Sequence, residues 1–250
     1  MTVFIPNNTI VNQGLLYVTG LQLAITGNRA MTMQAGQARN TTNINDIVLS
    51  SVATLDAATV GANGLDTGTL AANTFYAVHV IGSSTFAAST AIMISLSATA
   101  PYLPLNYDMF LRVGYIRTDA TPNILAGYWE GNSSERTFWY DTQIETLTAG
   151  TSATFAAVDL SLEVPYGHTT VMLDASFDAN AAGDTFALRP TGSSSSDGMT
   201  ILGASSGTAA PQQATTFAGV SSGDASIDYK VAASGSLVLS VVGYVDHLLG

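Results

Sequence analysis

Four carboxylates follow one another closely in the sequence and lie near both tryptophans of the chain. Glycoside hydrolases flank the bond they cleave with two carboxylates, so a carbohydrate depolymerase with an aromatic sugar platform is one interpretation. The other is a charged hairpin over residues 129–136, with solvated tips and interfacial tryptophans. Since the pattern has no sequence specificity, we expect the hairpin and keep the enzyme as an alternative. The residues are Glu130, Glu135, Asp141, Glu145, Trp129 and Trp139.

Two stretches, 203–207 and 219–223, match the Gly-x-Ser-x-Gly pattern of a hydrolase nucleophile. That chemistry needs the serine on a sharp turn between a strand and a helix. Neither stretch is followed by a helical pattern, and a chain rich in glycine and serine produces such matches by chance. We therefore expect loops at both places.

The remaining candidates for chemistry are three histidines and one acidic segment. His79, His168 and His247 are far apart in the sequence and match no zinc spacing. His79 alternates with apolar residues on a strand, and His168 follows a turn sequence. Residues 178–184 resemble a calcium loop in composition only, because the ligand spacing and the closing glutamate are missing. No phosphate loop or dinucleotide fingerprint is present, so we expect no catalytic, cofactor-binding or metal-binding residue.

Charge is scarce in this chain: 10% of its residues are charged, the net charge is −11, and its seven basic residues include one lysine. Nucleic-acid binding draws on clustered Lys and Arg, so this composition excludes a nucleic-acid partner. With 47% hydrophobic residues and so few charged ones, we expect other copies of the chain to cover part of the apolar surface, which predicts a homo-oligomer. There is no cysteine, and we expect neither a signal peptide nor a membrane segment.

Short alternating runs separated by turn residues predict an all-β protein. A change of texture near residue 142 predicts two domains, an N-terminal β-rich domain over 1–141 and a C-terminal antiparallel β-sandwich, jelly-roll-like, over 142–250. The clearest expected strands are residues 10–15, 21–26, 75–81, 91–97, 110–117, 124–129, 136–140, 154–162, 170–177, 185–189, 199–202, 227–231 and 236–245. In the last of these, Leu237, Leu239, Val241 and Val245 are expected on one face.

Several phrases of the sequence resemble virion structural proteins of tailed bacteriophages, of the fibre, spike or head-decoration type. They are RNTTNINDIVL at 39–49, NGLDTGTLAANTFYAVHVI at 63–81, SLSATAPYLP at 95–104, LRPTGS at 188–193, IDYKV at 227–231 and the closing Gly243-Tyr244. The resemblance covers most of the chain but contains no catalytic motif. It implies a virion surface component, commonly a homotrimer, and assigns no active-site residue.

We therefore predict a non-enzymatic virion protein, assembled in a bacterial cytoplasm, that binds copies of itself and capsid or tail proteins. Its first domain would anchor to the particle, and its second would face outward and contact a host glycan through residues 191–198 and 203–224. The alternative is a carbohydrate-binding or carbohydrate-degrading receptor-binding protein that uses the carboxylates near 130–145. A bacterial adhesin or surface-layer module is a third class, for which an export signal is expected.

Overall fold

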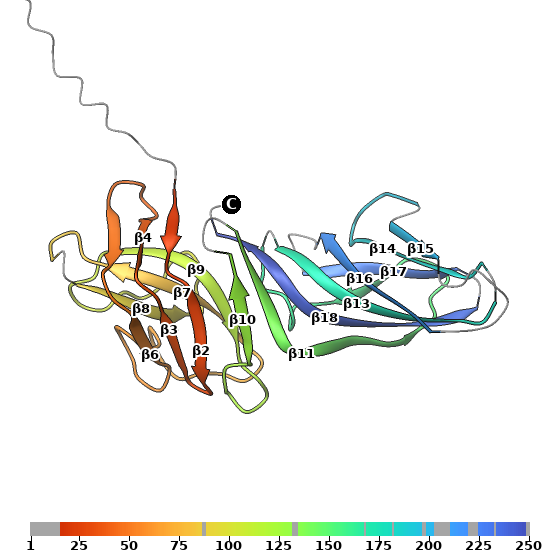
Figure 1. Cartoon of the computed structure of the whole chain (residues 1–250), viewed down its shortest axis with the longest axis horizontal. Coiled ribbons are helices and arrows are strands. Elements are labelled where there is room, and N and C mark those ends of the chain that lie inside the picture. The colour runs from red at the N-terminus through yellow and green to blue at the C-terminus, as the bar shows by residue number, and fades with distance from the viewer. Residues whose placement is uncertain are drawn as a thin grey trace, which may run out of the picture.

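The structure is a computed structural model that describes residues 16–86, 89–131, 135–167, 169–181, 183–196, 199–202, 211–219, 225–232 and 234–248. These residues form eighteen strands and no helix, which confirms the all-β prediction. None of them belongs to a helix that could cross a lipid bilayer. Two lobes lie side by side along the long axis of the molecule (Figure 1): we call strands β1–β10 the N lobe and strands β11–β18 the C lobe.

One antiparallel sheet of eight strands extends through both lobes. Its strands lie in the order β16-β13-β18-β11-β10-β2-β3-β6, and β10 and β11 form the junction between the lobes. The bounds are β16 (Pro211–Gly219), β13 (Thr169–Ala179), β18 (Gly235–His247), β11 (Glu135–Gly150), β10 (Gly127–Glu130), β2 (Leu23–Gly27), β3 (Ala30–Met33) and β6 (Ala53–Asp56).

The N lobe is completed by two three-stranded sheets. The first has the order β1-β4-β5, with β1 (Val18–Gly20), β4 (Gly36–Arg39) and β5 (Asp46–Leu49). The second has the order β8-β7-β9, with β8 (Thr90–Ser95), β7 (Phe75–Gly82) and β9 (Met109–Arg117). Central strand β7 is buried on both faces, since Leu103 and Tyr107 of the loop before β9 cover Ile81 and Met93.

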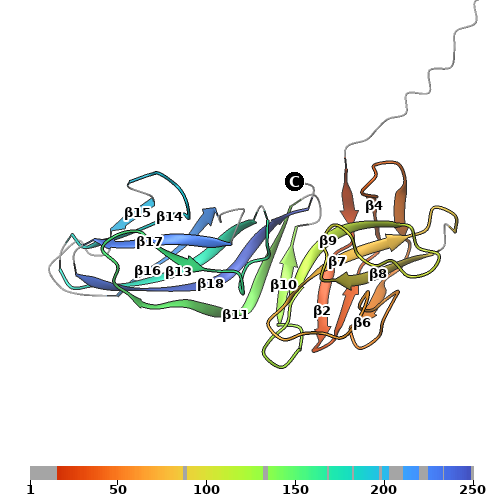
Figure 2. The ribbon, with the colours of Figure 1, turned by 180° about the vertical axis from the view of Figure 1, so that it is seen from behind.

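The C lobe is a sandwich of two four-stranded sheets. The β16-β13-β18-β11 part of the large sheet faces a sheet with the order β12-β17-β14-β15, and Figure 2 shows the two from behind. The second sheet consists of β12 (Ala156–Asp159), β17 (Ser226–Ala232), β14 (Thr185–Pro190) and β15 (Met199–Leu202). Counted along the lobe, strands 6-3-8-1 face strands 2-7-4-5, which is the jelly-roll arrangement with its two Greek keys. The jelly-roll-like sandwich predicted from sequence is thus confirmed.

Alternation along β13 builds the C-lobe core. Val171, Leu173, Ala175 and Phe177 are fully buried, and Phe177 packs against Phe186 of β14 with ring centroids 5.4 Å apart. The intervening Thr170, Asp174 and Ser176 are half-buried on the other face. This pattern of period two is the one that the sequence predicts.

In β18 the expected alternation holds only in part. Leu237, Leu239 and Val241 are buried on the core face, but beyond them Tyr244 and Asp246 are buried while Val245 is half-exposed. On β13, Met172 pairs with Gly243 and Leu173 with Val241, so Val242 is an extra residue. A β-bulge of this kind reverses which side chains face the core. The prediction that Val245 shares the face of Leu237 is therefore wrong.

Strand β11 is much longer than the predicted strand at 136–140 and passes through residues 141 and 142 without a break. Its residues 137–139 pair with both β10 and β18, Tyr140 pairs with β10, and the pairs between residues 144 and 150 are with β18 alone. The change of texture near 142 thus coincides with a change of strand partners. The division into domains 1–141 and 142–250 stays a prediction.

Replacing Gly243 tests the tight packing beside the bulge. A methyl group there would lie 2.2 Å from the carbonyl oxygen of Phe138 and 2.5 Å from Cε of Met172. We expect Gly243→Ala to lower the free energy of unfolding by about 1–3 kcal/mol, measured by urea denaturation. Gly27→Ala is the matched control, because its methyl group would meet only the Ala30 side chain at 3.7 Å. Equal losses in the two variants would contradict this account of the packing.

Candidate functional site

The two lobes are joined by a buried ion pair. Arg112 of β9 in the N lobe donates from Nη1 to Oδ2 of Asp246 in β18 of the C lobe, at 2.5 Å. Its Nη2 donates to the carbonyl oxygen of His247 at 3.1 Å. Burial lowers the pKa of Arg112, but attraction and hydrogen bonding from Asp246 outweigh it, so the pKa is raised. The ion pair fixes the position of β18 against β9.

Arg136 of β11 is a second guanidinium at this junction and is completely buried. Its Nη1 donates to the carbonyl oxygen of Val113 at 2.8 Å, and its Nη2 donates to that of Gly20 at 2.9 Å. Burial lowers the pKa of Arg136 to about 10, against the opposing attraction of Asp246, its cross-strand partner in β18. The side chain therefore stays cationic at neutral pH and holds β11 to β9 and to the end of β1.

Tyr140 and Glu163 extend the junction toward the C-lobe core. The hydroxyl of Tyr140 donates to the Glu163 carbonyl oxygen at 2.7 Å, and burial raises the pKa of Tyr140 well above its ordinary value. The pKa of the Glu163 carboxyl is also raised, because burial outweighs the attraction of Arg117. Tyr140 and Glu163 are both buried, so their contacts hold the segments of the junction together.

His79 is a core histidine, in agreement with its predicted place on a strand face. It is completely buried, and its Nε2 donates to the carbonyl oxygen of Ser97 at 3.0 Å. Phe110 meets the ring edge-on, with centroids 5.6 Å apart. Burial lowers the pKa of His79 to about 4, so the ring is neutral at pH 7.

In the structure, three of the four carboxylates of the 130–145 region each have a different partner. Glu130 accepts a hydrogen bond from Nε1 of Trp139 at 3.0 Å, and Glu135 lies 3.3 Å from His247. Glu145 accepts from the hydroxyl of Thr148, and Asp141 is exposed. The tryptophans separate as well: Trp129 is buried against Phe138 on the core face, whereas Trp139 lies on the outer face.

The acidic segment at 178–184 forms a turn after β13, as predicted. Oδ2 of Asp184 accepts from the amides of Asn180 and Ala181 at 3.0 and 2.9 Å. Across the described residues, no group of three His, Asp or Glu side chains could hold a metal ion. His168, the serines of both Gly-x-Ser-x-Gly stretches and the expected strand at 10–15 lie outside the described residues. Within 203–224, the segment expected to contact a host glycan, residues 211–219 form strand β16.

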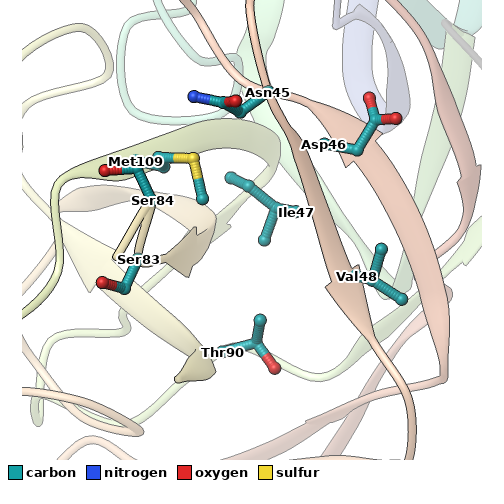
Figure 3. Close-up of a pocket in the computed structure, with 8 residues that line it drawn as sticks. All are labelled: Asn45, Asp46, Ile47, Val48, Ser83, Ser84, Thr90 and Met109. Carbon is teal, nitrogen blue, oxygen red and sulfur yellow. The ribbon is translucent and has the colours of Figure 1, made fainter. Parts of the chain in front are cut away.

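A small open pocket of about 270 Å³ lies between β5 and the ends of β7, β8 and β9. In Figure 3, the side chains of Ile47 and Met109 point toward each other, while the Asp46 carboxylate points away from them. Asp46 is already paired with Nε of Arg39 at 2.7 Å. The pocket therefore lacks a free acid–base pair. No sequence signal indicates it, because its walls come from distant segments, with Asn45, Val48, Ser83, Ser84 and Thr90 completing the lining.

An exposed apolar patch covers part of the N lobe, and we call Val60, Leu96, Tyr102 and Leu105 the N-lobe patch. Each is more than 60% exposed. Asp66 brings the segments together, because its Oδ2 accepts from the Ser95 hydroxyl at 2.6 Å and from the Tyr102 amide at 3.2 Å. Pro104 lies against Gly61, which places Leu105 near Val60.

Comparison with known proteins gives only weak similarities. No family model matches the chain, and no curated protein matches its sequence. Among solved structures, the chain is similar to the T13 particle of infectious bursal disease virus, with 13% identity over 93% of this chain and 69% of the other, and a TM-score of 0.21. The VP2 subviral particle of that virus gives 13% identity, 94% and 68% coverage and a TM-score of 0.23. These low scores carry no argument about function.

Breaking the buried ion pair is expected to be costly. Asp246→Asn removes the carboxylate from two buried arginines, and we expect a loss of about 3–5 kcal/mol in the free energy of unfolding by urea denaturation. Asp46→Asn is the matched control, since it breaks the Arg39 pair at a carboxylate that is 41% exposed, and a loss below about 1 kcal/mol is expected. A small loss in Asp246→Asn would contradict the central role of the junction.

His79 makes stability depend on pH. The unfolded chain takes up a proton on this ring as the pH falls below about 6.5, but the folded chain does so only near its lowered pKa of about 4. The free energy of unfolding should therefore fall by about 3 kcal/mol between these pH values on account of His79 alone. Denaturation of His79→Gln and the parent should show a difference that shrinks as the pH is lowered. A difference independent of pH would contradict the prediction.

Proposed function

We propose that the protein is a non-enzymatic structural component of a virion surface, which binds copies of itself and docks on the particle through its N lobe. The observation that carries this proposal is the N-lobe patch. Among the described residues, eight of the eleven large apolar side chains that are exposed lie between residues 44 and 105, which favours the N lobe as the docking side. Exposed patches of this kind mark interaction surfaces in soluble proteins.

Two further observations support a virion setting. The C lobe has the jelly-roll strand order, an architecture used by viral capsid domains among others. The phrases at 39–49, 63–81 and 95–104 resemble tailed-bacteriophage virion proteins, and the second and third contain Asp66 and two of the four residues of the N-lobe patch, Leu96 and Tyr102. We take the homotrimer, the capsid or tail partner and assembly in a bacterial cytoplasm from that resemblance.

The separate partners of these carboxylates favour a structural role over the depolymerase. Glu130, Glu135 and Glu145 each have a different neighbour, namely Trp139, His247 and Thr148. Hydrolysis of a glycosidic bond needs two carboxylates facing each other across one substrate. On this proposal the N-terminal domain, 1–141, contacts the particle, and the C-terminal domain, 142–250, faces outward.

Self-association gives a direct test. We expect the parent protein to sediment as an oligomer at micromolar concentration, with a mass near three chains. The double variant Leu96→Asp/Leu105→Asp places two carboxylates in the N-lobe patch and should sediment as a monomer. Leu162→Asp is the matched control, since Leu162 is an exposed apolar residue of the C lobe, and it should keep the parent's mass. A monomeric parent protein would overturn the proposed self-assembly.

A further inference from the structure

The outer face of the large sheet contains a row of side chains, of which the sequence singles out Trp139 alone. The strand registers place Tyr128 opposite Trp139, Trp139 opposite Gly243, and Gly243 opposite Met172. Residues directly opposite in neighbouring strands lie on the same face of a sheet. These four residues therefore form one continuous row across β10, β11, β18 and β13, which we call the outer row.

The outer row is flat, apolar and held in place. Tyr128 is 51% exposed, and its ring lies at 18° to that of Trp139, with centroids 6.5 Å apart. The hydrogen bond from Nε1 of Trp139 to Glu130, 3.0 Å long, fixes the indole. Gly243 adds no side chain, and Met172 occupies the space beside it, with Cε 2.5 Å from where a Cβ would stand. Met172 is 1% exposed and Gly243 is buried, so the accessible part of the row is the pair of aromatic rings of Tyr128 and Trp139.

Polar groups border the outer row on one side. The next cross-strand row contains Glu130, Thr137, Val245 and Thr170, so a carboxylate and two hydroxyls lie alongside the aromatic rings. Glu135 is also exposed on this side. The arginines of these and adjoining strands, Arg112 and Arg136, are turned inward to the junction. The border is therefore acidic and can accept hydrogen bonds.

This combination of groups selects a class of ligand. Aromatic faces bury the apolar C–H face of a ring, while carboxylates form strong hydrogen bonds with hydroxyl donors. A sugar ring offers both surfaces at once. The acidic border disfavours uronic and sialic acids, because two carboxylates lie there with one imidazole, His247, which already contacts Glu135. We propose that the outer row binds a neutral pyranose of an oligosaccharide, with Tyr128 and Trp139 stacking on the ring and Glu130 accepting from its hydroxyls.

Binding is tested with the full-length protein on an array of neutral hexose and N-acetylhexosamine oligosaccharides, printed beside sialylated and uronic-acid glycans. The strongest neutral ligand is then titrated by calorimetry. We expect Tyr128→Ala and Trp139→Ala each to weaken binding at least tenfold, and Glu130→Gln to weaken it severalfold. Trp139→Phe keeps an aromatic face and should retain more affinity than Trp139→Ala. Phe86→Ala is the matched control, because this exposed aromatic residue belongs neither to the outer row nor to the N-lobe patch, and the affinity of the variant should be unchanged.

Thermal unfolding of each variant separates loss of binding from loss of fold. The proposal is overturned if no neutral glycan binds at millimolar concentration, if anionic glycans bind more tightly than neutral ones, or if Trp139→Ala and Tyr128→Ala bind as the parent does. Tighter binding of choline, added as a competitor, would show that the acidic aromatic face is a cation site instead. Self-assembly depends on the N-lobe patch, so failure of that proposal leaves these outcomes unaffected.

Discussion

The burial of Arg136 is the constraint on which the arrangement of the two lobes depends. A guanidinium removed from water must find fixed acceptors, and here they are the carbonyl oxygens of Val113 and Gly20. The negative charge near it is Asp246, which is itself held by Arg112. Strands from both lobes therefore have to meet at one place and in one register. Buried ionic groups of this kind contribute to a unique arrangement more than to net stability.

Around that point the large sheet divides the molecule into an inner and an outer side. Its inner side packs against the β8-β7-β9 sheet in the N lobe and against the β12-β17-β14-β15 sheet in the C lobe, and it holds the buried aromatics Phe138 and Tyr244. The outer side has no second sheet over it in the described residues. Alternate side chains of a strand thus face the core or the outer side, as Phe138 and Trp139 of β11 do.

The sequence allows the strands and the sandwich class to be predicted, because alternation in β7, β13 and β18 reflects burial on one face or both. It does not allow the length of β11 to be predicted, since residues 141–148 are mostly polar and extend an exposed strand by pairing with β18 alone. The bulge at Val242 has no local signal. Arg112, Arg136 and Asp246 are far apart in the sequence, so no sequence pattern indicates that they meet at the junction between the lobes. The outer row likewise appears only when the register is known, because two strands lie between Met172 and Tyr128 in the sheet and the two residues are forty-four positions apart in sequence.

The continuous pairing of β11 with β18 has a mechanical consequence. In the C lobe these strands run along the long axis of the molecule (Figure 1), and their hydrogen bonds lie across it. A pull on the C lobe while the N lobe is held would load many of these bonds in shear at the same time instead of opening them one after another. The protein would then transmit tension from one lobe to the other, and Arg136 and Asp246 lie at the point where the load passes between them.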